Sequence, residues 1–150
     1  MRDRINAALK DAIKARDTRR TSTLRLINAA IKDRDIAARG EGREPVDEAE
    51  IMAILLKMVK QREESVVLYD KGGRTDLAEQ ERGEIEVIRD FLPRPLDDED
   101  ITAAISDAIA ETGAAGLRDM GKVVDVLKAR YPGRIDFGKA ARIVKQKLGA

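Results

Sequence analysis

The chain has 150 residues, of which 38% are charged and 43% are apolar, with two Phe, two Tyr and no Trp. This composition is typical of helical proteins, and the absence of Cys and His excludes disulfides, a thiolate nucleophile and the commonest metal ligand. No apolar run approaches the ~20 residues that cross a bilayer, and the charged N-terminus is unlike a signal peptide. We expect a soluble protein of a reducing compartment, most simply the bacterial cytoplasm, with no membrane partner.

The charge is unevenly distributed, although its net value is only +1. Residues 1–40 hold 11 Lys and Arg against 5 Asp and Glu, and residues 113–150 hold 9 against 3. Between them, residues 41–96 hold 9 against 14, and residues 97–112 hold none against 6. Basic ends of this kind indicate either a site for a polyanion or basic and acidic helices that pack side by side.

Apolar residues at helical spacing predict four helices in the first part of the chain. Asp17 or Thr18 is expected to cap the second helix, and Asp47 and Glu50 have the spacing of a capping box at the start of the third. The apolar stripes are Ile5, Leu9, Ile13; Leu24, Ile27, Ile31; Ile51, Ile54, Met58, Val66, Tyr69; and Leu77, Ile85, Ile88, Leu92.

The segment LPRPL interrupts this pattern because Pro93 and Pro95 disfavour helix at and before their own positions. We therefore expect a hinge at residues 93–96 between an N-terminal helical domain, 1–93, and a C-terminal domain, 97–150. Three helices are predicted in the second, with the stripes Ile101, Ile105, Ile109; Met120, Val123, Val124, Leu127, Tyr131; and Phe137, Ala141, Val144, Leu148. The predicted fold class is all-α, a four-helix domain followed by a three-helix bundle.

One motif occurs twice in the last third of the chain. DMGKVVDVL, which begins at Asp119, and DFGKAARIV, which begins at Asp136, share the order Asp, apolar, Gly, Lys. Each Asp stands where a helix N-cap belongs, whereas a Lys beside a helix N-terminus opposes the helix dipole. Either the N–H groups, the Gly and the Lys hold an anion, or the motif starts two helices whose glycines allow close packing.

The last predicted helix carries a basic ridge. Lys139, Arg142 and Lys145 recur every three residues, roughly opposite the apolar stripe, and Lys122 and Lys147 are possible neighbours. A Lys/Arg helix face is commonly only solvated, but it is also the pattern that contacts nucleic-acid phosphates. These five residues are the predicted nucleic-acid-binding set.

No catalytic residue, metal site or cofactor site is identified. Glu63 and Glu64 are adjacent, so they diverge around a helix, and no serine stands in a nucleophile elbow. Arg25 is crowded by Leu24 and Leu26, and we predict that it forms a structural ion pair with Glu63 or Glu64.

These segments resemble the GatB/YqeY family. DMGKVVDVLKARYPGRIDFGKAARIVKQKL resembles its C-terminal signature, and TLRLINAAIKDR, QREESVVLYDKGGRTDLAEQE and FLPRPL resemble its N-terminal signatures in the same order. The resemblance covers essentially the whole chain and matches the stand-alone YqeY-like proteins in length. It implies an all-helical fold with a four-helix and a three-helix domain, and it makes Gly121, Lys122, Gly138 and Lys139 signature residues.

The resemblance also bears on function. The same region forms the tail of the B subunit of the glutamyl/aspartyl-tRNA amidotransferase, where it helps to hold tRNA. The family carries a label of carbon–nitrogen ligase with glutamine as amido donor, but in that enzyme the chemistry lies in another domain and another subunit. The resemblance therefore implies no catalytic residue in this chain.

Three hypotheses about function follow. The first is a non-catalytic accessory protein of translation that binds tRNA or another structured RNA through the basic ridge. The second is a protein-interaction module that docks on an amidotransferase, an aminoacyl-tRNA synthetase or another complex. The third is an independent carbon–nitrogen ligase.

Overall fold

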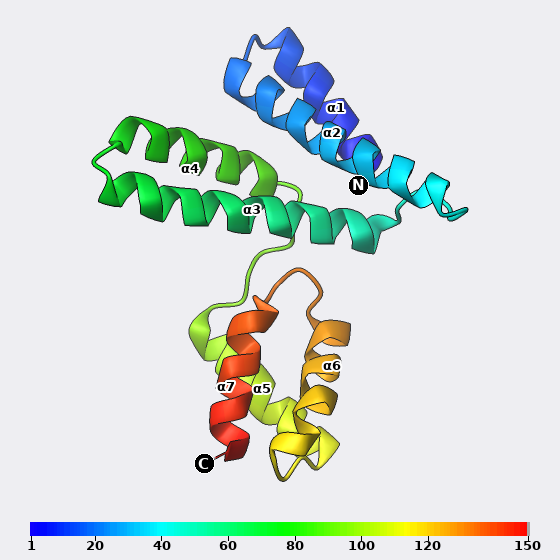
Figure 1. Ribbon diagram of the computed structural model, residues 1–150, viewed down its shortest axis with the longest axis vertical. Helices are drawn as coiled ribbons and strands as arrows, with labels where there is room; N and C mark the ends of the chain where they lie inside the picture. The colour runs from blue at the N-terminus through cyan, green and yellow to red at the C-terminus, as the bar shows by residue number, and fades with distance from the viewer. Residues whose placement is uncertain (150) are drawn as a thin grey trace. The chain divides into compact units, whose positions relative to one another are not determined.

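The computed structural model of the chain describes residues 1–149, and in these residues it contains α-helices, one short 3-10 helix and no β-strand (Figure 1). The predicted all-α class is therefore confirmed. Contacts divide the chain into two compact units, Met1–Leu92 and a second that begins at Pro93. The helices are α1 Arg2–Lys14, α2 Thr18–Gly40, α3 Glu48–Lys71, α4 Thr75–Arg89, α5 Asp98–Thr112, α6 Met120–Arg130 and α7 Phe137–Gly149, with the 3-10 helix η1, Leu117–Asp119, before α6.

In the first unit, α1 and α2 lie side by side, as do α3 and α4, and α2 contacts both α3 and α4 (Figure 1). Local capping explains where α2 and α3 begin. The Asp17 carboxylate accepts a hydrogen bond from the Arg20 N–H at 3.1 Å, and the Asp47 carboxylate accepts one from the Glu50 N–H at 2.9 Å. The large side chains that are fully buried in this unit are Ile5, Leu24, Ile27, Ile51, Leu55 and Ile88.

The predicted stripe of α1 is wrong at its last position. Ile13 is 49% exposed, whereas its neighbour Ala12 is buried. Position 13 lies in the last turn of α1, and the chain leaves the helix just beyond it through Arg16, whose φ is +57°. Helical spacing alone cannot tell how much of a helix end its partners cover, because that depends on where the neighbouring helices lie.

An ion pair connects the start of α1 to the C-terminal half of α2 and to the loop before α3. The Arg2 guanidinium donates to both carboxylate oxygens of Asp35, at 2.8 and 2.7 Å, and also to the Val46 carbonyl at 2.9 Å. The same carboxylate accepts from the Val46 N–H at 2.9 Å. The hydrogen bonds from Arg2 and then from Val46 lower the pKa of Asp35.

The second unit is built from α5, α6 and α7, which all contact one another. Asp97 caps α5 by accepting from the Asp100 N–H at 2.8 Å, and Gly113 ends the helix with a φ of +66°. The segment before α5 is tied to the loop before α7, since the Leu96 N–H donates to the Arg134 carbonyl and the Arg134 Nε donates to the Arg94 carbonyl, both at 2.9 Å. The buried residues of this unit are Ile101, Ala104, Ile105, Ala108, Val123, Leu127, Ile135, Ala140 and Val144.

Candidate nucleic-acid interface

The helix α7 begins at a true side-chain cap. The Asp136 carboxylate accepts hydrogen bonds from the N–H groups of Gly138, at 2.9 Å, and Lys139, at 3.3 Å. Ala140 and Val144 then face the core of the second unit, and Arg142 and Lys145 are exposed. The helix contains no acidic residue between 137 and 149, so its exposed side has uncompensated positive charge within the helix itself.

The five predicted phosphate-contacting side chains differ in what they touch. Lys139 Nζ lies 2.5 Å from Asp98 Oδ1 in the first turn of α5, and Lys147 Nζ donates to Ser106 Oγ at 3.2 Å. Lys122 Nζ lies 4.0 Å from Asp119 Oδ1. Arg142, Lys145 and Lys147 have no carboxylate within 4.0 Å among residues 1–149, and of these three only Lys147 donates a side-chain hydrogen bond. Arg142 and Lys145 are therefore the part of the ridge that neither pairs with a carboxylate nor donates a side-chain hydrogen bond within residues 1–149.

The two copies of the repeated motif behave differently. Asp119 is the last residue of η1, and its carboxylate accepts from the Ala115 N–H at 3.1 Å instead of capping α6. That backbone hydrogen bond lowers the pKa of Asp119. The prediction that Asp119 caps a helix with its side chain is therefore wrong, because the preceding 3-10 turn directs the carboxylate backward along the chain.

The glycines of the motif are not required for helix packing. A β-carbon added at Gly121 would have no atom within 4 Å, and one added at Gly138 would meet only Asp136 Oδ1, at 3.2 Å. Close approach of α6 and α7 therefore does not explain either glycine. At Gly138 the missing side chain leaves room for the capping carboxylate.

The predicted ion pair of Arg25 is wrong. Arg25 is exposed, and no carboxylate among residues 1–149 lies within 4.0 Å of it. Glu63 instead accepts from Arg89 Nη2 at 2.7 Å, and Glu64 is exposed. Leu24 and Ile27 turn toward the core, and the helical turn between them leaves Arg25 on the outer face of α2.

A half-buried ionic cluster between α3 and α4 was not anticipated. Arg62 Nε lies 2.9 Å from Glu84 Oε2 and 4.0 Å from Glu81 Oε2, and Arg62 Nη1 donates to the Met58 carbonyl at 3.2 Å. Burial, and then the charge of Glu84, raises the pKa of Glu81. The pairing joins residues about twenty positions apart on two helices, so no local spacing in the sequence signals it.

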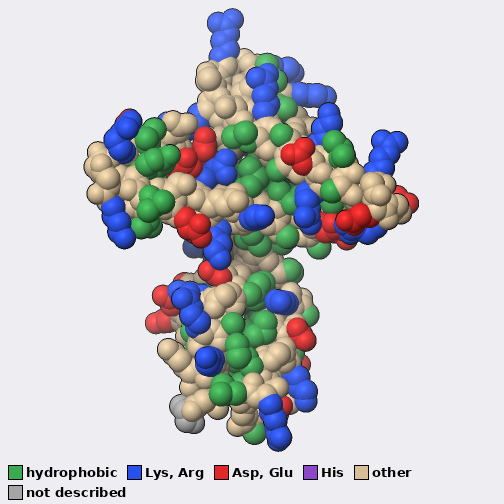
Figure 2. All heavy atoms as spheres, viewed as in Figure 1, with side chains coloured by type: hydrophobic (Ala, Val, Ile, Leu, Met, Phe, Trp, Pro, Cys, Tyr) green, Lys and Arg blue, Asp and Glu red, His purple; other side chains and the backbone are tan. Residues whose placement is uncertain are grey.

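An open groove of about 570 Å³ lies at the end of the α1–α2 pair, and no pattern in the sequence indicates it. It is lined by two apolar residues, two arginines and three hydroxyl residues, namely Ile13, Leu26, Arg16, Arg25, Thr18, Thr21 and Ser22. Elsewhere, Lys and Arg side chains are spread over both units on the face shown in Figure 2 and do not form one continuous patch.

Residues 1–149 contain no group of three Asp, Glu, His or Cys side chains placed to hold a metal ion. Within the same residues, no helix combines the length and the apolar character that crossing a bilayer requires.

Comparison with known proteins identifies the family. A family model described as Yqey-like protein matches residues 2–148. The chain is 33% identical over 123 residues to altered inheritance of mitochondria protein 41, mitochondrial, of Lachancea thermotolerans, a match that covers 78% of this chain and 64% of that protein. It is 34% identical over 101 residues to the protein of the same name from Eremothecium gossypii, covering 67% of this chain and 54% of that protein. The matches thus span less than two thirds of these relatives' own length.

These relatives correct one prediction. The chain was expected to belong to the bacterial cytoplasm, but the curated relatives come from yeasts and are named as mitochondrial proteins. Those names place the relatives in mitochondria, and this finding contradicts the assignment of the chain to the bacterial cytoplasm. Composition could not have made this distinction, because the absence of cysteine fits any reducing compartment.

Proposed function

Because the chain belongs to the Yqey-like protein family, we propose that it is a non-catalytic accessory protein that binds structured RNA, tRNA first, through the exposed side of α7. The observation that carries this proposal is the pair Arg142 and Lys145, which are exposed and have no carboxylate partner among residues 1–149. A phosphate that meets two such cations releases condensed counterions, and this release drives binding.

The surroundings of this pair favour recognition of the RNA backbone. The second unit has only one Tyr and one Phe, Tyr131 and Phe137, and both are partly buried against its core. Without exposed aromatic rings there is no platform on which single-stranded bases could stack. Contact with phosphates of a folded RNA, read by its shape, is the mode that fits such a surface.

We propose that α1–α4 and α5–α7 act as separate domains joined at residues 93–96, so that the second can hold RNA while the first is free for other contacts. Components of an amidotransferase or of an aminoacyl-tRNA synthetase are the proposed protein partners. The proposal predicts that purified chain incubated with mischarged tRNA, glutamine and ATP forms no amidated product, whereas the carbon–nitrogen ligase hypothesis predicts turnover.

The test is a salt titration of tRNA binding with charge-matched variants. Replacing Arg142 and Lys145 together with Gln should weaken binding and lower the slope of log K against log salt by roughly 1.4–1.8, about 0.7–0.9 for each lost phosphate contact. The matched control replaces Arg118 and Lys128 with Gln, since both are exposed in the same unit and neither has a carboxylate within 4.0 Å among residues 1–149. An equal loss in the two double variants would reduce the effect to net charge and remove α7 as the site.

A further inference from the structure

The groove at the end of the α1–α2 pair exposes apolar side chains in a concave surface. Its lining includes Ile13, which is 49% exposed, and Leu26, which is 45% exposed. Single exposed apolar side chains are common, but these two come from different helices and line one hollow of about 570 Å³. The groove therefore offers apolar surface in a concave setting, which is where ligands and partner segments bind.

Positive charge borders this apolar surface. Arg16 and Arg25 both line the groove, and neither has a carboxylate within 4.0 Å among residues 1–149. The neighbouring carboxylate of Asp17 is engaged with the Arg20 N–H at the start of α2. The two guanidinium groups are thus available for an external anion, and a planar guanidinium matches a carboxylate with two parallel hydrogen bonds.

The backbone at Arg16 supplies a separate observation. Its φ is +57°, the only positive φ outside glycine among residues 1–149. The Arg16 N–H donates to the Ile13 carbonyl and the Asp17 N–H donates to the Ala12 carbonyl, at 3.1 and 3.0 Å, so Arg16 occupies the left-handed position that ends α1. Glycine is the usual residue there because it has no β-carbon to clash.

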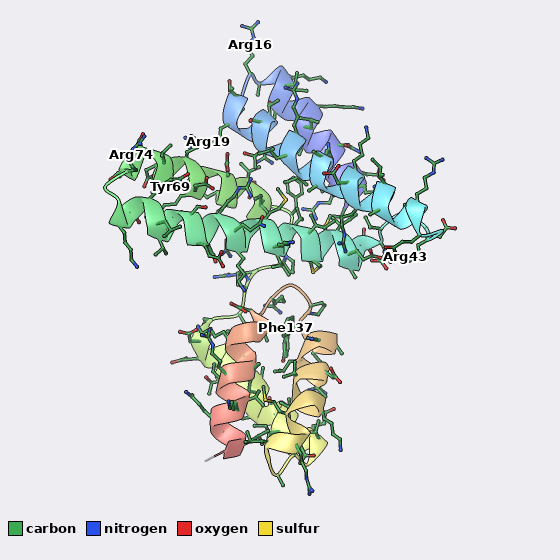
Figure 3. All side chains as sticks on the ribbon, viewed as in Figure 1. Arg16, Arg19, Arg43, Tyr69, Arg74 and Phe137 are labelled. Carbon is green, nitrogen blue, oxygen red and sulfur yellow. The ribbon has the colours of Figure 1, made fainter. Side chains whose placement is uncertain are left out.

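An arginine at this position is held in a costly conformation, and such conformations concentrate at functional sites. Figure 3 shows Arg16 projecting from the α1–α2 turn away from the ribbon, with no element of the first unit beyond it. The Arg16 side chain forms no ion pair within residues 1–149 that could offset the cost of this backbone conformation. A use for the side chain outside this unit is therefore the simplest physical account of the arginine.

We propose that the groove binds an acidic segment of a partner protein, with an apolar side chain of the segment on Ile13 and Leu26 and its carboxylates on Arg16 and Arg25. Charge complementarity and the exposed aliphatic side chains of the lining favour a protein segment over RNA. Phosphates of RNA could pair with the arginines but would make no apolar contact with Ile13 and Leu26. The groove also has no aromatic ring on which a base could stack. This site lies in the first unit and is independent of the RNA proposal for α7.

The experiment selects peptides from a random phage-displayed library on the full-length chain. We expect enrichment of peptides in which Asp or Glu stands beside an aliphatic or aromatic residue. A fluorescent peptide of this class should lose affinity about a hundredfold for the double variant Arg16→Gly, Arg25→Gln, because two charge-assisted pairs are lost and each is worth about tenfold. Arg34→Gln is the matched control, since Arg34 is also exposed on α2 without a carboxylate within 4.0 Å among residues 1–149, and it should leave the affinity unchanged.

A single variant at Arg16 distinguishes an effect on peptide binding from an effect on folding, because glycine relieves the backbone strain at this position. The single variant Arg16→Gly should melt at a higher temperature than the parent chain while it binds the peptide more weakly, so the loss cannot come from unfolding. Four results would overturn the proposal: no enrichment, enriched peptides without acidic residues, undiminished binding to the double variant, or displacement of the peptide by tRNA. Self-association of the parent chain that disappears in Arg16→Gly would also overturn it, because the occupant would then be a second copy.

Discussion

The Arg19 side chain lies over Gly83, in the middle of α4. A β-carbon added at Gly83 would be 2.5 Å from Arg19 Nη1, 2.8 Å from its Cδ and 3.0 Å from its Cζ. Figure 3 shows Arg19 directed from α2 toward α4. Glycine in a helix interior is unfavourable, so this contact between the two helices accounts for its presence.

We expect Gly83→Ala to have different effects with and without Arg19. In an Arg19→Ala background, it should raise the free energy of unfolding by about 0.8–1 kcal/mol, the helix-propensity gain of Ala over Gly. With Arg19 present the gain should be smaller, because the guanidinium must move away. Urea unfolding of the parent, the two single variants and the double variant measures the coupling between the two positions. Equal effects of Gly83→Ala in both backgrounds would contradict the contact.

Asp35 should contribute to acid unfolding. Its folded-state pKa is lowered by hydrogen bonds from Arg2 and Val46, so its contribution to stability is present above its unfolded pKa of about 3.9 and is lost as the pH falls through the folded value. Asp35→Asn should therefore destabilise the chain at pH 7, and the difference from the parent should shrink below about pH 4.

The control for Asp35 is Asp33→Asn. Asp33 is exposed on the same helix and has no basic partner within 4.0 Å among residues 1–149, so its replacement should change the unfolding free energy little at any pH. Thermal melts across the pH range supply the measurement. A constant gap between Asp35→Asn and the parent from pH 7 to pH 3 would contradict the assigned role.

The pKa of Glu81 is shifted in the opposite direction to that of Asp35. Burial and the charge of Glu84 raise its pKa, so the folded state binds the proton more tightly than the unfolded state, and stability falls as the pH rises through that interval. Glu81→Gln should raise the melting temperature at pH 7 and lose this advantage below about pH 4, near the unfolded pKa of Glu. The control is Glu86→Gln, at an exposed position of the same helix, which should leave the melting temperature unchanged at both pH values.

The two aspartates of the repeated motif should have separable local effects. Asp136→Ala should speed amide hydrogen exchange at Gly138 and Lys139 and cost about 1 kcal/mol of stability, as for other lost N-caps. Asp119→Ala should instead speed exchange at Ala115 and leave the first turn of α6 unchanged. Faster exchange throughout the start of α6 would show that Asp119 caps that helix after all.

Local features were predictable where their causes are local. Asp17 and Asp47 cap the helices that were expected to start beside them, because a short carboxylate reaches only the N–H groups of its own first turn, and Asp97 caps α5 in the same way. Gly73 takes a φ of +72° at the end of α3, as a helix-ending glycine should. The all-α class followed from apolar spacing in the same way.

The sequence by itself determined which segments are helices and where the prolines and glycines end them, since these depend on neighbours within a few residues. Only the tertiary structure decided which charges meet. Arg62 pairs with Glu84 and Lys139 with Asp98, while Arg25 meets no carboxylate among residues 1–149. The partner of a charge and the exposure of a residue such as Ile13 depend on how distant helices pack. That packing is set by the combined burial of many side chains.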